Sequence, residues 1–206
     1  MILEIALTIL FFALAVSVHE FCHAYVANKL GDPTARLSGR LTINPIAHID
    51  LFGTVLIPLF LLVSGTRFLF GWAKPVPVNF LNLKNPKKDM IKIAIAGPVS
   101  NIVMGFFVFI ALKFVPDNFV IYKGLEGALY LNIALAIFNM IPVFPLDGSK
   151  ILAGLLPYDL EYKYMQYEKY GSIILLLLVV TGVTGFILQL FAPMILLIFI
   201  LLTFWF

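Results

Sequence analysis

The sequence predicts an all-α polytopic membrane protein with about five transmembrane helices, one re-entrant segment and a small membrane-associated β-element. Of the 206 residues, 62% are hydrophobic and only 12% are charged, whereas a soluble domain carries roughly 25% charged residues. The mean hydropathy of +1.03 agrees with this composition. Apolar runs follow one another without a gap the size of a soluble domain, so we expect a single integral-membrane domain over residues 1–206.

Apolar stretches of spanning length recur along the chain, since a helix that crosses a bilayer needs about 20 apolar residues. They lie at about 5–26, 51–70, 91–115, 128–146 and 171–206. The last stretch is long enough for two short helices, and Ala192-Pro193 is a natural hinge between them because proline interrupts helices. We therefore expect a C-terminal helical hairpin over about 168–206.

The connecting segments contain many turn-forming residues. Within residues 31–50, the run from Leu37 to Ile43 predicts a short strand. Residues 71–86 contain three prolines, and Pro75 and Pro77 suit an extended edge segment. The two segments are predicted to pair as a small sheet near the membrane surface.

The strongest chemical signal is the sequence His19-Glu20-Phe21-Cys22-His23, which has the pattern H-E-x-x-H. Residues i and i+4 lie on one face of a helix, so both imidazoles can face one metal ion, with Glu20 beside them as general base. The motif lies in an apolar run, where each ionisable residue costs a few kcal/mol. A divalent cation would offset that cost, whereas surface histidines on an interfacial helix would not need one.

Zinc in a catalytic site takes three protein ligands and keeps one position open. The candidate for the third ligand is Asp147, a polar residue at the end of an apolar run that contains Pro142 and Pro145. Broken backbone of this kind is tolerated at membrane depth only inside protein or beside a cavity. The alternative is an ordinary aspartate that ends a helix at the membrane interface.

Two further polar residues have less defined roles. Asn101 follows Gly97-Pro98 early in an apolar run, and it can make an interhelical hydrogen bond or contact a substrate. His48 is expected to make a structural hydrogen bond, because two histidines and an aspartate already complete a zinc ligand set.

Five motifs occur in an order that resembles the site-2-protease family of intramembrane zinc metalloproteases: HEFCH at 19–23, GRLTINPIAHID at 39–50, GWAKPVPVN at 71–79, GPVSN at 97–101 and NMIPVFPLDG at 139–148. The resemblance implies that His19, His23 and Asp147 bind one Zn²⁺ per chain and that Glu20 activates water. It also implies that Asn139 and Asn101 hold the substrate strand or the oxyanion. The chain resembles a minimal prokaryotic-type member without PDZ or CBS domains, with its catalytic core at about 1–150.

Topology constrains the segment at 51–70. The two histidines lie near the end of the first apolar run, and Asp147 ends the run at 128–146, so both run ends must lie on one side of the membrane. This requires that 51–70 is re-entrant or otherwise does not span. Segments 27–50 and 71–92 together carry eight Lys or Arg, against Lys123 alone in 116–126. The positive-inside rule therefore places the active site toward the cytoplasm of a multi-pass cell-membrane protein.

These observations predict regulated intramembrane proteolysis, with transmembrane proteins as substrates, the lipid bilayer as surroundings and no nucleic-acid partner. A membrane zinc hydrolase acting on soluble or lipid-linked peptides would use the same chemistry. A metal carrier usually shows repeated halves, which this sequence lacks. A protein that merely binds zinc would not need Glu20. The sequence does not define an oligomeric state.

Overall fold

The computed structural model describes residues 2–50, 53, 56, 73–117 and 119–204, and its described part is entirely helical apart from turns and extended segments. The long helices are α1 (Ile2–Lys29), α4 (Pro86–Leu112), α5 (Val120–Asn139) and α9 (Val183–Leu202). The shorter α-helices are α2 (Thr34–Leu37), α6 (Asp147–Leu155), α7 (Tyr158–Met165) and α8 (Gly171–Val180). Single 3₁₀ turns form η1 (Pro45–His48), η3 (Phe80–Asn82) and η4 (Glu168–Tyr170).

Within the described residues, four helices are long and apolar enough to cross a bilayer, which makes the chain a multi-pass membrane protein. They are Ala6–Lys29 of α1 and the whole of α4, α5 and α9. The described residues thus contain four of the about five predicted spans. The difference arises at α8, whose ten residues rise only about 15 Å and are too short to span alone.

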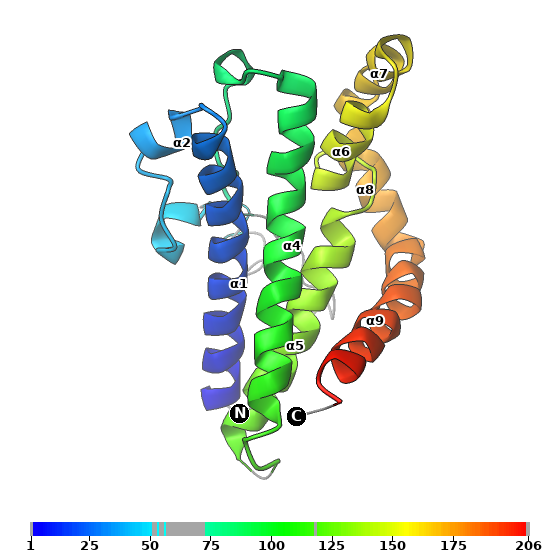
Figure 1. The fold of residues 1–206 in the computed structure, drawn as a ribbon. Coiled ribbons are helices and arrows are strands. Elements are labelled where there is room, and N and C mark those ends of the chain that lie inside the picture. Colours follow the sequence, from blue (N-terminus) through cyan, green and yellow to red (C-terminus); the bar gives the residue numbers. More distant parts are fainter. Residues whose placement is uncertain (1, 51–52, 54–55, 57–72, 118, 205–206) are drawn as a thin grey trace.

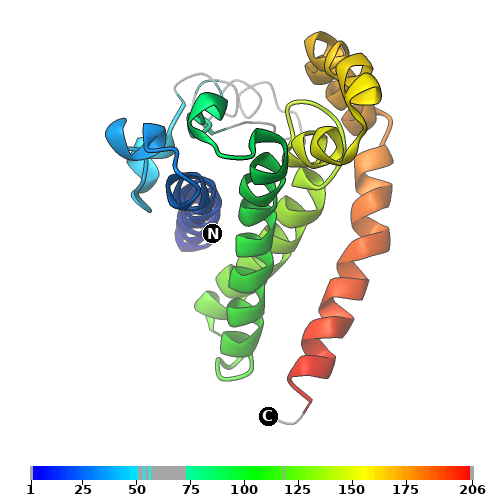
Figure 2. The same ribbon diagram turned by 45° about the horizontal axis from the view of Figure 1, so that its top comes forward.

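The expected C-terminal hairpin is replaced by two helices that follow one another in the same general direction (Figures 1 and 2). The chain breaks at Gly182, which has a positive φ of 80°, and the next helix continues through Pro193. The break therefore lies at Gly182 and not at the predicted proline hinge, because glycine readily adopts the left-handed conformation that ends α8.

Helix α4 is central to the fold: it packs against α1 on one side and against α5 and α6 on the other (Figure 1). Helix α9 covers α5, where Phe199 packs into a cluster with Leu129, Ile133 and Ile137. The C-terminal end of α1 and the N-terminal end of α4 lie at the same end of the bundle, together with α6. The predicted re-entrant stretch at 51–70 lies outside the described residues, apart from isolated positions.

The predicted β-element is absent, since the described residues contain no strand. Leu37 ends helix α2, and Gly39 follows with a positive φ of 67°. Residues 73–79 are extended, but their N–H groups bind acceptors other than a partner strand. Lys74 N–H donates to the backbone oxygen of His48 (3.0 Å), and Asn79 N–H donates to the Asp32 carboxylate (2.7 Å). Two prolines in this segment cannot donate at all, which disfavours a strand ladder.

Candidate metal centre

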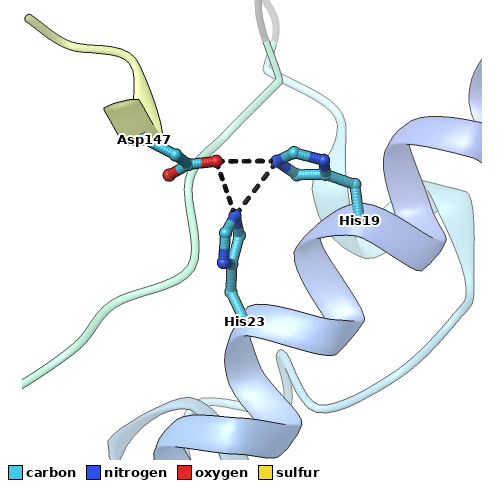
Figure 3. A group of neighbouring side chains, drawn as sticks. All are labelled: His19, His23 and Asp147. Atoms are coloured by element: carbon cyan, nitrogen blue, oxygen red, sulfur yellow. Dashed lines mark hydrogen bonds and ion pairs between the residues drawn. The ribbon is translucent and has the colours of Figure 1, made fainter. Parts of the chain in front are cut away.

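Three side chains that are distant in sequence converge at one end of the bundle. His19 and His23 lie one turn apart on α1, and Asp147 is the first residue of α6 (Figure 3). The Asp147 Oδ2 atom is 3.1 Å from His19 Nε2 and 3.0 Å from His23 Nε2, and the two Nε2 atoms are 3.0 Å apart. All three residues are buried. The structure therefore brings together the three residues that the sequence proposed as ligands.

The outer nitrogens of both imidazoles face hydrogen-bond acceptors. His19 Nδ1 lies 2.6 Å from Asn101 Oδ1, and His23 Nδ1 lies 2.6 Å from the Ile93 carbonyl oxygen. An acceptor on Nδ1 holds the ring proton there and leaves the lone pair on Nε2. Both Nε2 lone pairs consequently point toward Asp147 Oδ2.

Three electron-rich atoms at mutual distances of 3.0 to 3.1 Å repel one another unless a cation lies among them. Tetrahedral zinc with ligand bonds of about 2.0–2.2 Å separates its ligand atoms by about 3.3 Å, close to the spacing found here. Two imidazoles and one carboxylate also match the composition of catalytic zinc sites. The residues therefore fit a single zinc ion, with one coordination position left for water or substrate.

Asp147 is suited to remain a carboxylate at this buried position. Burial by itself disfavours its charge, but a cation held among the three ligand atoms would favour the ionised form of this carboxyl group. Its second oxygen, Oδ1, lies 3.3 Å from Lys150 Nζ. Position 147 also begins a helix, where the macrodipole favours negative charge.

Gly97 allows α4 to approach the two histidines closely. A Cβ atom at this position would lie 2.4 Å from His23 Nε2 and 2.5 Å from His19 Nε2, far inside contact distance. Only glycine leaves room here for the two Nε2 atoms. Gly97 belongs to the GPVSN motif of the sequence, but the motif alone does not reveal this close approach.

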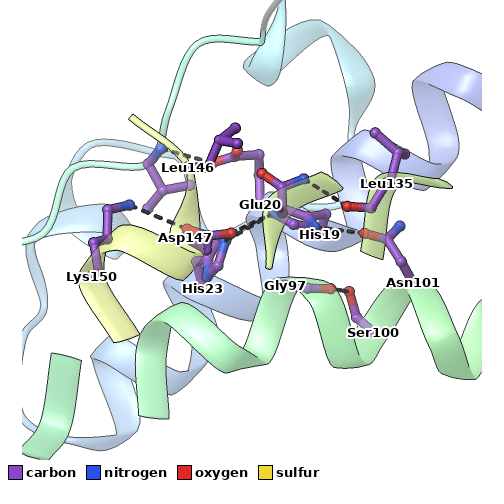
Figure 4. A network of polar contacts seen from close by, with 12 residues as sticks. His19, Glu20, His23, Gly97, Ser100, Asn101, Leu135, Leu146, Asp147 and Lys150 are labelled. Atoms are coloured by element: carbon purple, nitrogen blue, oxygen red, sulfur yellow. Dashed lines mark hydrogen bonds and ion pairs between the residues drawn. The ribbon is translucent and has the colours of Figure 1, made fainter. Parts of the chain in front are cut away.

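Glu20 is half-buried beside the cluster (Figure 4). Its Oε2 atom accepts a hydrogen bond from the backbone N–H of Val76, at 2.9 Å. The extended segment 73–79 thus contacts the predicted general base directly. Arg40 steadies this segment, because its Nη2 atom donates to the carbonyl oxygen of Lys74 (2.6 Å).

The two asparagines proposed to contact substrate lie in different surroundings. Asn101 is fully buried and hydrogen-bonds to α1 and α5, which is the interhelical alternative. Asn139 is half-buried at the end of α5, and its Nδ2 donates to the Leu135 carbonyl oxygen within the helix. His48 makes the expected structural hydrogen bond, with Nε2 2.8 Å from the Thr42 oxygen. A substrate contact for Asn139 or Asn101 stays a prediction.

Together with the membrane-spanning helices, this cluster assigns the chain to the class of membrane metallopeptidases. The sequence model of Peptidase family M50 matches residues 118–182. A Bacillus subtilis protein named "Putative zinc metalloprotease YwhC" is 41% identical over 84% of this chain and 79% of its own length. The "Zinc metalloprotease MJ0392" of Methanocaldococcus jannaschii is 30% identical over 80% of this chain and 38% of its own length.

The chain belongs to peptidase family M50, the site-2-protease family, and is a zinc metalloprotease. The resemblance drawn from the five sequence motifs is thereby confirmed. No solved structure matches the chain with significance.

Proposed function

We propose that this zinc metalloprotease hydrolyses peptide bonds within the transmembrane segments of membrane-protein substrates. The observation that carries the proposal is the position of the ligand cluster. His19 and His23 lie inside the candidate span Ala6–Lys29, and Asp147 reaches them from the corner between α5 and α6. A zinc site buried among membrane-spanning helices is suited to substrates that arrive through the bilayer.

In this proposal His19, His23 and Asp147 hold the zinc ion, which when bound polarises a carbonyl group and lowers the pKa of water to about 7. The helices fix the ligands before zinc arrives: α1 sets the spacing of the histidines, and α6 presents the carboxylate. Asn101 and the Ile93 carbonyl hold both rings with Nε2 facing inward.

Glu20 acts as general base and then as general acid. Its carboxylate takes a proton from the attacking water as the water oxygen bonds to the scissile carbonyl carbon. It then returns that proton to the leaving amine nitrogen as the C–N bond breaks. The Val76 N–H, 2.9 Å from Oε2, orients the carboxylate without protonating it.

We place the active site toward the cytoplasmic side. Lys29 ends α1, Lys88 lies in the first turn of α4 and Lys84 lies just before that helix, and positively charged segments of this kind favour the cytoplasm. Labelling of single introduced cysteines in intact cells, with Cys22 replaced by alanine, would test this orientation.

The experiment that tests the function compares the wild-type chain with Glu20→Gln in liposomes containing a model transmembrane substrate. We expect about one zinc per chain in both proteins and cleavage by the wild type alone. Mass spectrometry of the products should locate the cut within the transmembrane segment. Cleavage of soluble or lipid-linked peptides only would indicate the alternative hydrolase function. Equal cleavage by Glu20→Gln would refute the proposed mechanism.

A further inference from the structure

A chain of buried amide groups connects α5 to the metal cluster through α4. Asn132 on α5 is 1% exposed and Asn101 on α4 is 0% exposed. Asn132 Oδ1 lies 3.0 Å from Asn101 Nδ2, and Asn101 Oδ1 lies 2.6 Å from His19 Nδ1. Asn132 therefore acts on His19 through one intermediate residue, although it lies outside the cluster itself.

A backbone carbonyl oxygen, which can only accept, determines the direction of each hydrogen bond between Asn132, Asn101 and His19. Asn132 Nδ2 donates to the Ala128 carbonyl oxygen at 2.8 Å, so Asn132 must turn its oxygen toward Asn101. Asn101 must then present its NH₂ group to Asn132 and its oxygen to His19. An oxygen at this place accepts from His19 Nδ1–H and cannot donate to it.

A second carbonyl supports the same orientation. The Asn101 NH₂ group also donates to the Ala15 carbonyl oxygen of α1, at 3.2 Å. The two hydrogens of this group are thus shared between Ala15 and Asn132. If Asn132 lost its oxygen, one buried N–H of Asn101 would lose its partner, and only the longer bond would oppose rotation of the amide.

We propose that Asn132 is a positioning residue that holds His19 in the tautomer protonated at Nδ1, so that its Nε2 lone pair faces the zinc. The proposal rests on the proposed role of His19 as a ligand. A rotated Asn101 would present NH₂ to His19 Nδ1 and favour the opposite tautomer, whose Nε2–H cannot bind a metal.

His23 serves as an internal control, because its Nδ1 faces the Ile93 carbonyl oxygen directly and does not depend on an amide side chain. Loss of Asn132 should therefore change the state of His19 and leave that of His23 unchanged. A general loosening of the site would instead affect both rings.

The test uses the full chain in detergent micelles with ¹⁵N-labelled histidine, as wild type, Asn132→Leu and Asn132→Asp. Leucine removes both the donor and the acceptor at similar size. Aspartate keeps an oxygen that can accept from Asn101, so it should preserve the amide orientation. Thr203→Val is the matched control, since it removes another buried hydrogen bond, from Thr203 Oγ1 to Phe199, far from the site.

We expect Asn132→Leu to bind zinc about tenfold more weakly than the wild type, as measured by competition with a chelator. This is the lower end of the loss of about 10–100-fold that follows when a residue supporting a metal ligand is changed. The His19 ¹⁵N shifts of its zinc-free form should show a mixture of tautomers, with His23 unchanged. Asn132→Asp and Thr203→Val should bind zinc within about twofold of the wild type, well below the effect expected for a lost ligand partner.

Unchanged zinc affinity and unchanged His19 shifts in Asn132→Leu would overturn the proposal, because Ala15 alone would then orient Asn101. Equal shifts of His19 and His23 would also overturn it, in favour of general loosening. If Asn132→Leu does not fold, the zinc-free wild type decides: a His19 protonated at Nε2 contradicts the proposal. If His19 were not a zinc ligand at all, the result would differ from these outcomes, because the ¹⁵N shifts of wild-type His19 would then not change when zinc is added.

Discussion

The zinc ligands and the general base are held by two different kinds of structure. His19, His23 and Asp147 project from α-helices, and the outer contacts of the two histidines are buried groups on the neighbouring helix α4. Glu20 projects from the same α1 helix, but its contact is the extended segment 73–79. That segment is held by side chains of the loops, chiefly Arg40 and Asp32.

The difference separates metal binding from proton transfer. Packing between helices is dense and rigid, so the ligand positions are determined by the fold. The surroundings of Glu20 depend instead on a few hydrogen bonds between loops, each contributing about 0.5–3 kcal/mol. Changes in the helical part should therefore reduce zinc affinity, whereas changes in the loops should reduce cleavage at constant zinc content.

The largest effect is expected for Asp147→Asn. An amide oxygen is a weaker ligand than a carboxylate, and the variant also removes the charge that balances zinc. Changing a residue that only hydrogen-bonds to a metal ligand already lowers metal affinity about 10–100-fold. We therefore expect Asp147→Asn to lower the zinc affinity more than about 100-fold and to abolish cleavage. Zinc titration against a chelator measures it. Lys150→Met is the control on the same helix and should stay within about fivefold, since its ion pair is partly exposed.

Gly97→Ala should have the next largest effect. The added methyl group would lie 2.4 Å from His23 Nε2, so α4 or the rings must move. We expect about 1–3 kcal/mol of destabilisation and a zinc affinity reduced about tenfold or more. Gly127→Ala on α5 is the matched control, because no atom lies within 4 Å of its Cβ position. Wild-type zinc affinity in Gly97→Ala would show that the close approach is not required.

Arg40→Met tests the loop side of the comparison. Methionine keeps an apolar chain of similar length but cannot bind the Lys74 carbonyl oxygen. Loss of a charged hydrogen bond worth about 1.5–3 kcal/mol should displace segment 73–79 and slow cleavage about tenfold or more. Zinc content should be unchanged. A parallel loss of zinc and activity would contradict the separation of the two regions.

The smallest effect concerns pH and Asp32, which is fully buried between α1 and α2. Burial raises the pKa of its carboxyl group, but hydrogen bonds from Asn82, Thr34 and Asn79 outweigh this and lower the pKa below its usual value. The ionised Asp32 carboxylate therefore stabilises the folded protein fully above about pH 3.9, the pKa of an aspartate in the unfolded state. This stabilisation is lost as the pH falls through the lower pKa that Asp32 has in the folded state.

This stabilisation should appear as a difference of about 1–2 kcal/mol in unfolding free energy between the wild type and Asp32→Asn at pH 7. Denaturant titration at pH 7, 5 and 3 should show that the difference shrinks with acidification. A constant difference across this range would exclude the ionised carboxylate as its source.

Local spacing predicted the two histidines as ligands and made Asp147 a candidate, whose ligand role was implied by the family resemblance. The i, i+4 relation of His19 and His23 follows from helix geometry, and the broken run before Asp147 marked the third position. The shared membrane side of these residues was a requirement of one common metal ion, and counting crossings under that requirement gave the prediction for 51–70. None of these inferences requires knowledge of how the helices rotate against each other.

The remaining features depend on that rotation. Helices α4 and α5 are apolar around most of their circumference, because lipid and protein core both favour apolar residues, so periodicity does not reveal which face meets which. Asn132 and Gly97 therefore could not be linked to His19 in advance. The Val76–Glu20 contact and the missing strand result from loop conformations that proline content alone does not determine.

The separation of the ligands along the chain has a consequence for folding. His19 and Asp147 are 128 positions apart, so a shared zinc ion would close a long loop of the polypeptide. A cross-link that closes a loop of about 100 residues removes chain entropy worth up to roughly 4.7 kcal/mol from the unfolded state. The catalytic ion would then also act as a cross-link between the first helix and the second half of the chain. The complete site can bind zinc only after residue 147 has been synthesised.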